Sequence, residues 1–258
     1  MSYGAIISDF HYTIINEDEI VFWEELTKDI LNHCYLPPSP LIAMRISKGK
    51  EELEALGNDY RNGKLESNKF YTKFNEIVLE GTDIDNINRF VKKYADESQK
   101  KLQNHLLDYI SISKAHFKGI ISTGYKKAIR NVLGIYEQVF NRIDANTITF
   151  MTDYNKQFDK KPKDSIRIVN GFHLSVNKHK GEHLEDLRKE NKIKGKIVVI
   201  GDSEEDESMY QQPGVIPVVS NLATDDFKQK CAKLYTAEIL ENQKDFGMFL
   251  DKISKNYD

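Results

Sequence analysis

The sequence contains little of what marks a secreted, disulfide-bonded or membrane-spanning protein. Its 258 residues include two cysteines, Cys34 and Cys231, which lie far apart and form no metal-binding or redox spacing. No run of about 18 or more apolar residues occurs, so no segment is predicted to cross a bilayer. The start, MSYGAIISDF, lacks a basic leader and becomes acidic too early for a secretory signal. We therefore expect a cytoplasmic protein with reduced thiols.

The charge balance excludes a second group of functions. Lysine and arginine number 37 against 40 aspartate and glutamate residues, so the formal net charge is only -3. Such a balance gives no general attraction to nucleic acid or to an anionic membrane surface. Hydrophobic residues make up 40% of the chain, which is typical of a globular protein with a core of its own. We expect no nucleic-acid or membrane partner, and a monomer or homodimer.

Four short apolar runs predict the strands of a buried parallel sheet. Short β-branched runs that stop at Ser, Asp or Gly are typical of strands covered on both faces. The runs are Ala5–Ile7, Gly119–Ile121, Ile148–Met151 and Lys196–Ile200. After residue 115 strands and helices alternate, which predicts a doubly wound sheet. A polar, lysine-rich stretch after Met151 predicts a hairpin or a long surface loop.

About one hundred residues separate the first two runs, and they carry almost no strand signal. Apolar side chains recur there at helical spacing, as at Ile20, Trp23, Leu26 and Ile30. Trp23 is expected in the core of this segment. The prediction is an α/β fold with a mostly parallel Rossmann-like sheet and helices on both faces. Residues 1–15 and 115–258 would form this core, and 16–114 a helical cap inserted after the first strand.

Polar side chains follow the predicted strands at the points where they end. Asp9 to Thr13 follow the first strand, Ser122-Thr-Gly124 the second, and Gly201 to Asp206 the last; Lys180 opens a helix shortly before it. Ligands of open α/β sheets bind at the carboxyl ends of the strands. Carboxylates, a hydroxyl and a lysine that meet at such an edge can bind a divalent cation and a phosphate together.

These residues resemble the four motifs of the haloacid dehalogenase superfamily. Asp9 to Thr13 resembles the first motif, Ser122 the second, Lys180 the third, and Gly201 to Met209 the fourth. Order and spacing are similar to those of phosphoserine-phosphatase-like members, and 60–70 (YRNGKLESNKF) resembles their cap. Several motifs in one order and in suitable structural contexts are a specific signal, although each alone is weak.

The resemblance implies a phosphoric monoester hydrolase that works in two steps. Asp9 would attack phosphorus and form an aspartyl-phosphate, which water then hydrolyses. Asp9, Asp202 and the backbone carbonyl of His11 would hold Mg²⁺, and Asp206 would support that shell or orient Lys180. Ser122 and Lys180 would hold the phosphate oxygens, with Thr123 and Gly124 completing the substrate-binding motif. The expected partner is a small phosphorylated metabolite.

The position two residues after the nucleophile departs from the family pattern. Phosphatases of this group carry there a second aspartate that donates and accepts the reaction's protons, whereas this chain has His11. Metal binding is unaffected, since it uses only the backbone carbonyl. Imidazole titrates near neutrality, so His11 could itself carry the proton. The alternatives are a phosphatase using His11, a phosphotransferase or hydrolase of activated phosphates, and a catalytically weak phosphate-binding or regulatory protein.

Some further residues have more than one interpretation. Asp18 is a candidate for binding a substrate amino group, with Glu17 and Glu19 beside it, and Arg45 and Arg61 are candidates for a substrate carboxylate. Ser122 could instead cap the next helix. His179 and His183 have a spacing seen at zinc sites. A third ligand is not evident, so both histidines are expected to be exposed helix residues.

Overall fold

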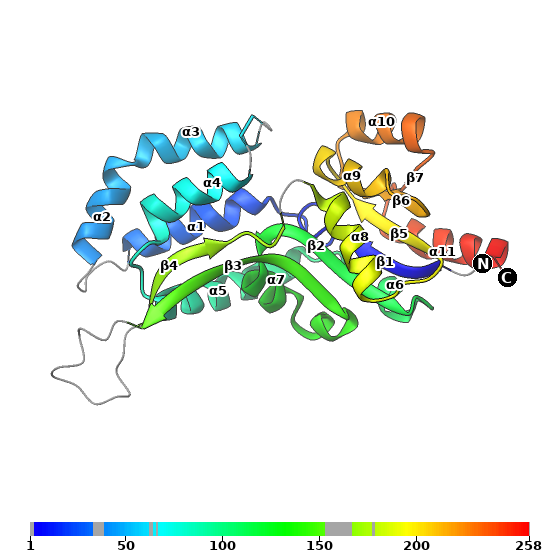
Figure 1. Cartoon of the computed structure of the whole chain (residues 1–258), viewed down its shortest axis with the longest axis horizontal. Coiled ribbons are helices and arrows are strands. Elements are labelled where there is room, and N and C mark those ends of the chain that lie inside the picture. The colour runs from blue at the N-terminus through cyan, green and yellow to red at the C-terminus, as the bar shows by residue number, and fades with distance from the viewer. Residues whose placement is uncertain are drawn as a thin grey trace. The chain divides into compact units, whose positions relative to one another are not determined.

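The computed structural model describes residues 3–32, 39–61, 64–65, 67–152, 167–176 and 179–257. The chain forms two compact units (Figure 1). The first comprises Met1–Asp18, Glu97–Ala145 and Val176–Asp258, and the second Glu19–Asp96 and Asn146–Ser175. Residues 97–114, predicted to belong to the cap, thus fall in the first unit. Residues 146–175, predicted to belong to the core, fall in the second. The predicted domain boundaries stay a prediction.

A sheet with the strand order β4-β3-β2-β1-β5-β6-β7 is the centre of the fold. Its parallel strands in the first unit are β1 (Tyr3–Ser8), β2 (Phe117–Tyr125), β5 (Lys196–Gly201), β6 (Val215–Val219) and β7 (Glu238–Ile239). Strand β1 pairs in parallel with β2 on one side and with β5 on the other. Every residue of β1 is buried, as the continuous apolar run predicts. Strands β6 and β7 extend the sheet beyond the predicted ones.

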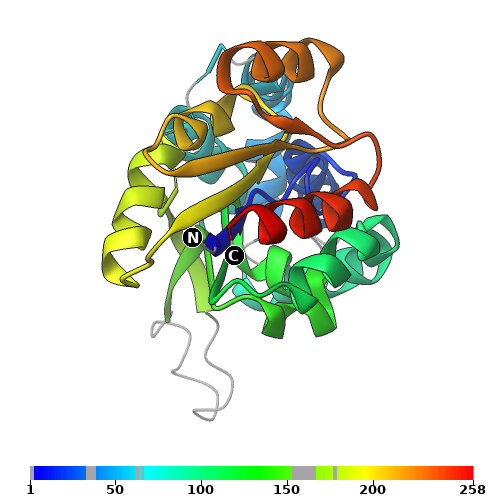
Figure 2. The ribbon, with the colours of Figure 1, turned by 90° about the vertical axis from the view of Figure 1, so that its right-hand side faces the viewer.

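Helices cover both faces of this sheet, which confirms the predicted doubly wound α/β class. The side chains of Ile7 and Val199 pack in one cluster with Leu184, Met209 and Phe227. Figure 2 shows α8 (Lys180–Glu190), which carries Leu184, on one side of the sheet and the C-terminal helix α11 (Asp245–Tyr257) on the other. The helices of the first unit are α6 (Asn104–Ile112), α7 (Lys126–Leu133), α8 (Lys180–Glu190), α9 (Glu207–Tyr210), α10 (Asp225–Tyr235) and α11 (Asp245–Tyr257). Short 3₁₀ turns span Gln99–Lys101, Gly134–Val139 and Glu204–Asp206.

The run Ile148–Met151 does not form the buried parallel strand that was predicted. It lies in β3 (Arg142–Thr152), whose residues from Thr147 onward pair antiparallel with β4 (Arg167–His173). The Phe150 side chain is 47% exposed, so an apolar run here does not mean burial on both faces. The pairing agrees with a hairpin, and its connection, 153–166, lies outside the described residues.

The second unit is mainly helical, as predicted for the insertion. Its helices are α1 (Glu19–Asn32), α2 (Ser39–Lys48), α3 (Lys50–Arg61), α4 (Ser67–Phe74), a π-helical turn (Asn75–Leu79) and α5 (Ile84–Ser98), which ends in the first unit. Trp23 is 1% exposed and packs on Tyr71, Phe74 and Phe172, which confirms that it belongs to the core. No helix among the described residues is long and apolar enough to cross a membrane.

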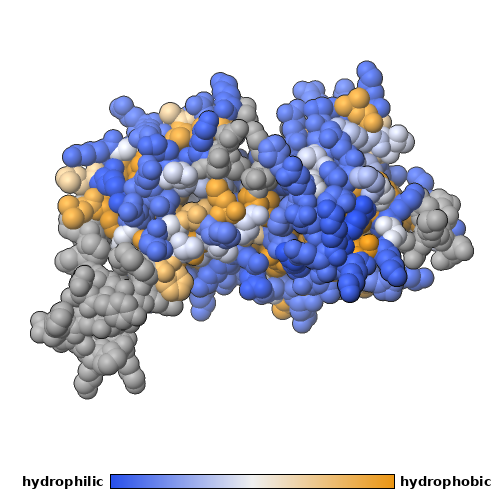
Figure 3. Space-filling view, viewed as in Figure 1, coloured by the Kyte–Doolittle hydropathy of each residue, from blue (hydrophilic) through white to orange (hydrophobic). Residues whose placement is uncertain are grey.

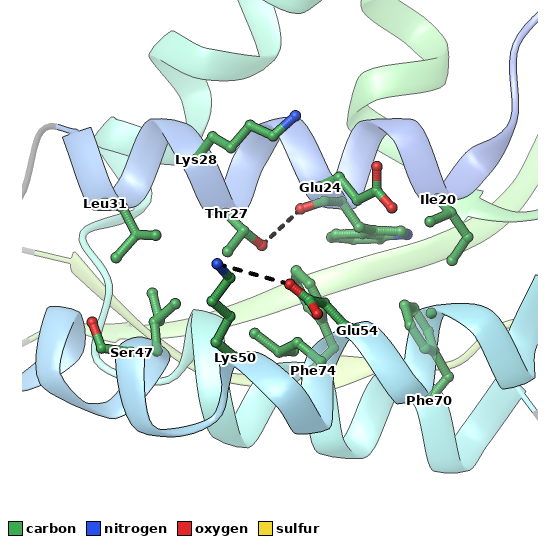
Figure 4. Close-up of a pocket in the computed structure, with 14 residues that line it drawn as sticks. Ile20, Glu24, Thr27, Lys28, Leu31, Ser47, Lys50, Glu54, Phe70 and Phe74 are labelled. Carbon is green, nitrogen blue, oxygen red and sulfur yellow. Dashed lines mark hydrogen bonds and ion pairs between the residues drawn. The ribbon is translucent and has the colours of Figure 1, made fainter.

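A hollow of about 410 Å³ lies between α1 and α3 of this unit (Figure 4). Its walls are mostly apolar and include Phe70 and Phe74. On one side, Lys50 and Glu54 of α3 form an ion pair at 3.9 Å. Thr27 in the opposite wall donates its hydroxyl to the Trp23 carbonyl. Lys50, Glu54 and Thr27 therefore have partners within the unit itself.

Candidate active site

The carboxyl ends of three neighbouring strands bring the predicted motifs to one edge of the sheet. Ser8, the last residue of β1, lies opposite Ile120 of β2 and Ile200 of β5. The backbone N–H of Asp9 donates to the Ile200 carbonyl at 2.9 Å, which continues this register beyond the strand. Ser122 and Asp202 come two residues after Ile120 and Ile200. The spacing of the motifs along the chain thus becomes proximity in space.

Three aspartates form a compact cluster at this edge. Carboxylate oxygens of Asp9, Asp202 and Asp206 lie within 4.8 Å of one another, and the three residues are at most 9% exposed. Burial, and then the charges of Asp206 and Asp9, raise the pKa of Asp202 well above its usual value. Oδ1 of Asp9 is buried and accepts no well-aligned hydrogen bond among the described residues, although the Lys180 ammonium lies 3.2 Å away. The cluster therefore has more negative charge than its surroundings neutralise.

Lys180 is the cation that faces this cluster. It is the first residue of α8 and is 1% exposed. Its Nζ lies 2.8 Å from Oδ1 of Asp206 and 3.2 Å from Oδ1 of Asp9. Burial lowers the pKa of Lys180, but Asp206 and Asp9 outweigh it and the net shift is upward, so the lysine stays charged. Among the described residues, the charge of Lys180 thus stands against three carboxylates, a set that suits a divalent cation.

Asp206 differs from the other two aspartates because both of its carboxylate oxygens accept hydrogen bonds from the protein. Besides Lys180, it accepts the backbone N–H of Asp202 at 2.9 Å and that of Ser203 at 3.4 Å. Ser203 and Asp206 cap the 3₁₀ turn reciprocally. These contacts are those expected of a residue that orients Lys180 and the loop; the other predicted role of Asp206, support of the metal shell, stays a prediction.

The turn after β1 is held by side chains for which the sequence motifs predict no role. Thr13 donates its hydroxyl to Oδ1 of Asp202 at 2.8 Å. The Ser220 hydroxyl donates to the Tyr12 carbonyl at 2.9 Å, and Gln103 donates its side-chain amide to the Thr13 carbonyl. Tyr12 has φ +48°, a left-handed conformation that is unusual outside glycine. The position of Thr13 in the first motif was a signal; Gln103 and Ser220 have none in the sequence.

The second motif lies at the end of β2. Ser122 is completely buried, and its Oγ accepts the backbone N–H of Gly124 at 3.2 Å; Thr123 is 4% exposed. Helix α7 begins only at Lys126, with Tyr125 as its N-cap, so the interpretation of Ser122 as a helix cap is wrong. A Cβ atom at Gly124 would lie 2.5 Å from Cε1 of His11. The absence of a side chain at 124 therefore makes room for the His11 imidazole.

His11 lies between Phe10 and Gly124. The Phe10 and His11 rings meet edge to face with centroids 5.2 Å apart. Burial lowers the pKa of His11 to about 4, with Lys180 acting in the same sense and Asp18 against it. The imidazole is consequently neutral at neutral pH in this state. A neutral ring can accept a proton but has no acidic proton to give.

Of the candidates for binding the rest of a substrate, Asp18 belongs to the first unit and Arg45 to the second. Asp18 is half-buried, whereas Glu17 beside it is buried and accepts hydrogen bonds from Ser98 at 2.8 Å and from Lys101. Arg45 donates to the carbonyls of Ile77 at 2.9 Å and Glu80 at 2.7 Å, around the end of the π-helical turn. The side chain of Arg61 lies outside the described residues.

Of the two histidines with zinc-like spacing, His179 is exposed as expected, but His183 is half-buried. Nε2 of His183 lies 2.9 Å from Oδ2 of Asp144, a residue of β3 that the sequence did not single out. Neither histidine belongs to a cluster of three metal-binding side chains among the described residues.

Comparisons with known proteins give a consistent fold. No protein-family model and no curated protein matches the sequence. A substrate-bound phosphoserine phosphatase structure is similar with a TM-score of 0.55 and 17% identity, over 94% of this chain and 95% of that one. A phospho-aspartyl intermediate analogue of phosphoserine phosphatase gives 0.53 and 19%, over 93% of each chain. Cytosolic 5'-nucleotidase IIIB bound to cytidine gives 0.60 and 16%, over 98% and 86%. The chain therefore shares the fold of these phosphatase and nucleotidase structures, in agreement with the α/β fold that the sequence predicted.

Proposed function

We propose that this protein is a magnesium-dependent phosphatase that hydrolyses a small phosphomonoester through an aspartyl-phosphate on Asp9. The observation that carries the proposal is the buried cluster in which Lys180 contacts both Asp9 and Asp206 at the carboxyl edge of the sheet. The similarity to a phosphoserine phosphatase and its phospho-aspartyl analogue supports the same chemistry. The names of these proteins and of the 5'-nucleotidase support a small phosphorylated substrate.

The residues present fit a divalent cation. Oδ1 of Asp9 is buried and accepts no well-aligned hydrogen bond among the described residues. Oδ1 of Asp202 accepts the Thr13 hydroxyl. Asp9, Asp202 and the His11 carbonyl would hold Mg²⁺, and Asp206 would keep Lys180 in place. When bound, Mg²⁺ supplies positive charge that neutralises the phosphate oxygens and the cluster.

In the first step an oxygen of Asp9 bonds to phosphorus as the ester bond to the leaving oxygen breaks. Lys180 and the Ser122 hydroxyl would stabilise the charge on the equatorial oxygens, together with the backbone N–H of Thr123; the N–H of Gly124 would hold the Ser122 hydroxyl in place. In the second step water attacks the aspartyl-phosphate, which restores Asp9 and releases inorganic phosphate. The proton lost by the water must be taken up by a nearby base.

His11 favours a second candidate function, the hydrolysis of activated phosphates. Its neutral imidazole, with a pKa of about 4, can accept the proton of that water but is a poor donor to a leaving oxygen. A substrate with a good leaving group, such as an aryl or acyl phosphate, needs no such donor. We infer that activated phosphates are turned over faster than alkyl phosphomonoesters.

The decisive experiment measures phosphate release from p-nitrophenyl phosphate and from acetyl phosphate, with Mg²⁺ and with EDTA. We expect Mg²⁺-dependent turnover in the wild type and none in Asp9→Asn. Residual turnover by Asp9→Asn would exclude the aspartyl nucleophile. Absence of turnover in the wild type, combined with Mg²⁺-dependent binding of inorganic phosphate by calorimetry, would favour the binding or regulatory alternative.

A further inference from the structure

Helix α8 carries Lys180, and two contacts attach this helix to strand β3. Near its start, Nε2 of His183 lies 2.9 Å from Oδ2 of Asp144. At its end, Glu190 accepts from Arg142 at 2.5 Å. Arg142 also donates its Nε to Asp144 at 2.8 Å. The four side chains thus form one network, with both β3 residues in the part of that strand that belongs to the first unit.

The two contacts differ in their surroundings. The side chains of His183 and Asp144 are 24% and 10% exposed, whereas that of Glu190 is 58% exposed. The outward face of α8, which includes Glu190, is hydrophilic (Figure 3). An exposed ion pair contributes little, while a hydrogen bond to a largely buried carboxylate fixes its donor more firmly. The contact of His183 is therefore the stronger constraint on the helix.

His183 lies three residues after Lys180, which is one helical turn, so both project from the same side of α8. On another side of this first turn, the backbone N–H of Gly181 donates to the Ser208 hydroxyl at 3.0 Å. The first turn is consequently held from α9 and from β3 at once. Lys180 reaches Asp206 at 2.8 Å but Asp9 only at 3.2 Å. Of its two contacts, the one with the nucleophile is the first that a small displacement of α8 would lose.

We propose that Asp144 and His183 are a positioning pair that fixes the first turn of α8 and thereby the reach of Lys180 to Asp9. The inference rests on the proposed function for its kinetic consequence, but its geometric content concerns only residues of the first unit. A misplacement of about 1 Å can cost about 100-fold in rate even when the altered residue does not touch the substrate.

The kinetic test compares four proteins with p-nitrophenyl phosphate and Mg²⁺. We expect His183→Ala to lower kcat by about 10-fold or more, with KM within about 2-fold, because Lys180 acts on the transition state. His183→Gln keeps an amide donor for Asp144 and should recover most of the loss. Glu190→Ala removes the other contact of α8 and should leave kcat unchanged. A kcat unchanged in His183→Ala, or lost equally in Glu190→Ala, would overturn the proposal.

A structural readout separates this inference from the proposed function. Crystal structures of the wild type and His183→Ala, both without metal, should differ in the Nζ–Oδ1 distance between Lys180 and Asp9, which should lengthen from 3.2 Å. The contact with Asp206 should remain. An unchanged Lys180–Asp9 distance would overturn the positioning role. If the wild type hydrolyses no phosphate ester, the proposed function fails and this comparison alone decides the positioning role.

Discussion

The two units of the chain bury charged side chains in opposite ways. In the second unit, Glu19 is buried but accepts from the Trp23 indole at 3.3 Å and the Tyr60 hydroxyl at 3.4 Å. Arg45 likewise places its donors on carbonyls. In the first unit, Asp9, Asp202 and Asp206 share one lysine and remain in excess. Buried charge that the fold satisfies is structural, and buried charge left uncompensated indicates a ligand site.

Removal of Lys180, which contacts the acidic cluster, should have the largest effect on the stability of the first unit. Lys180→Ala would leave three buried carboxylates without a cation, and breaking a buried ion pair costs about 3–5 kcal/mol. We expect a large fall in the free energy of unfolding in EDTA and loss of Mg²⁺-dependent phosphate release. Denaturant titrations with and without Mg²⁺ measure the first effect. A stability equal to that of the wild type in EDTA would mean that the cluster is already neutralised by protons.

Magnesium binding should have the next largest effect, and it should depend on pH. The raised pKa of Asp202 means that the folded state keeps this proton to higher pH than the unfolded chain does. In EDTA the contribution of Asp202 is therefore fully present below about pH 4 and is lost as the pH rises through its folded-state pKa. Mg²⁺ at about 100 times its Kd should add about 2.7 kcal/mol at neutral pH.

Thermal unfolding between about pH 5 and pH 8, in EDTA and in Mg²⁺, measures this dependence. Asp202→Asn is the matched control, because its amide does not titrate and it should remove both the pH dependence and the shift with Mg²⁺. A shift with Mg²⁺ that survives in Asp202→Asn would place the cation elsewhere.

The charged groups of the second unit should behave differently. Arg45→Met removes two hydrogen bonds to backbone carbonyls and should destabilise the protein by about 2 kcal/mol. The gain in stability with Mg²⁺ should remain that of the wild type, because Arg45 donates to carbonyls of its own unit. Thermal unfolding with and without Mg²⁺ tests both points. A lost response to Mg²⁺ would contradict the division between structural and uncompensated charge.

The contact between His11 and Gly124 should give the smallest effect. Gly124→Ala places a methyl group against the imidazole and should destabilise the protein by about 1–3 kcal/mol. In a His11→Ala background the same substitution should cost much less. A double-mutant cycle in thermal unfolding measures this coupling. Additive effects of the two substitutions would mean that the crowding lies with other atoms around Gly124.

The sequence predicts the site better than it predicts the structure that supports it. Parallel strands end at one edge, so Asp9, Ser122 and Asp202 could be placed together from their positions after apolar runs. Asp144, Gln103 and Ser220 could not, because they act through partners distant in the sequence and belong to no local pattern.

The run Ile148–Met151 shows a second limit. Its hydrophobic residues are consistent with burial on both faces, and only the structure reveals that this run pairs antiparallel with β4 and leaves Phe150 exposed. A short apolar run defines a strand but does not define its partners. The site residues themselves stay predictions until the substitutions described above are made.

The close packing around Gly201 has a consequence for how the protein tolerates change. A Cβ atom there would lie 2.4 Å from Oδ2 of Asp206, the carboxylate that holds both Lys180 and the Asp202 backbone. Gly201 performs no chemistry, yet alanine at this position would push against the support of two charged neighbours. In a library of all single substitutions, position 201 should be as intolerant as Asp9, and for a purely steric reason.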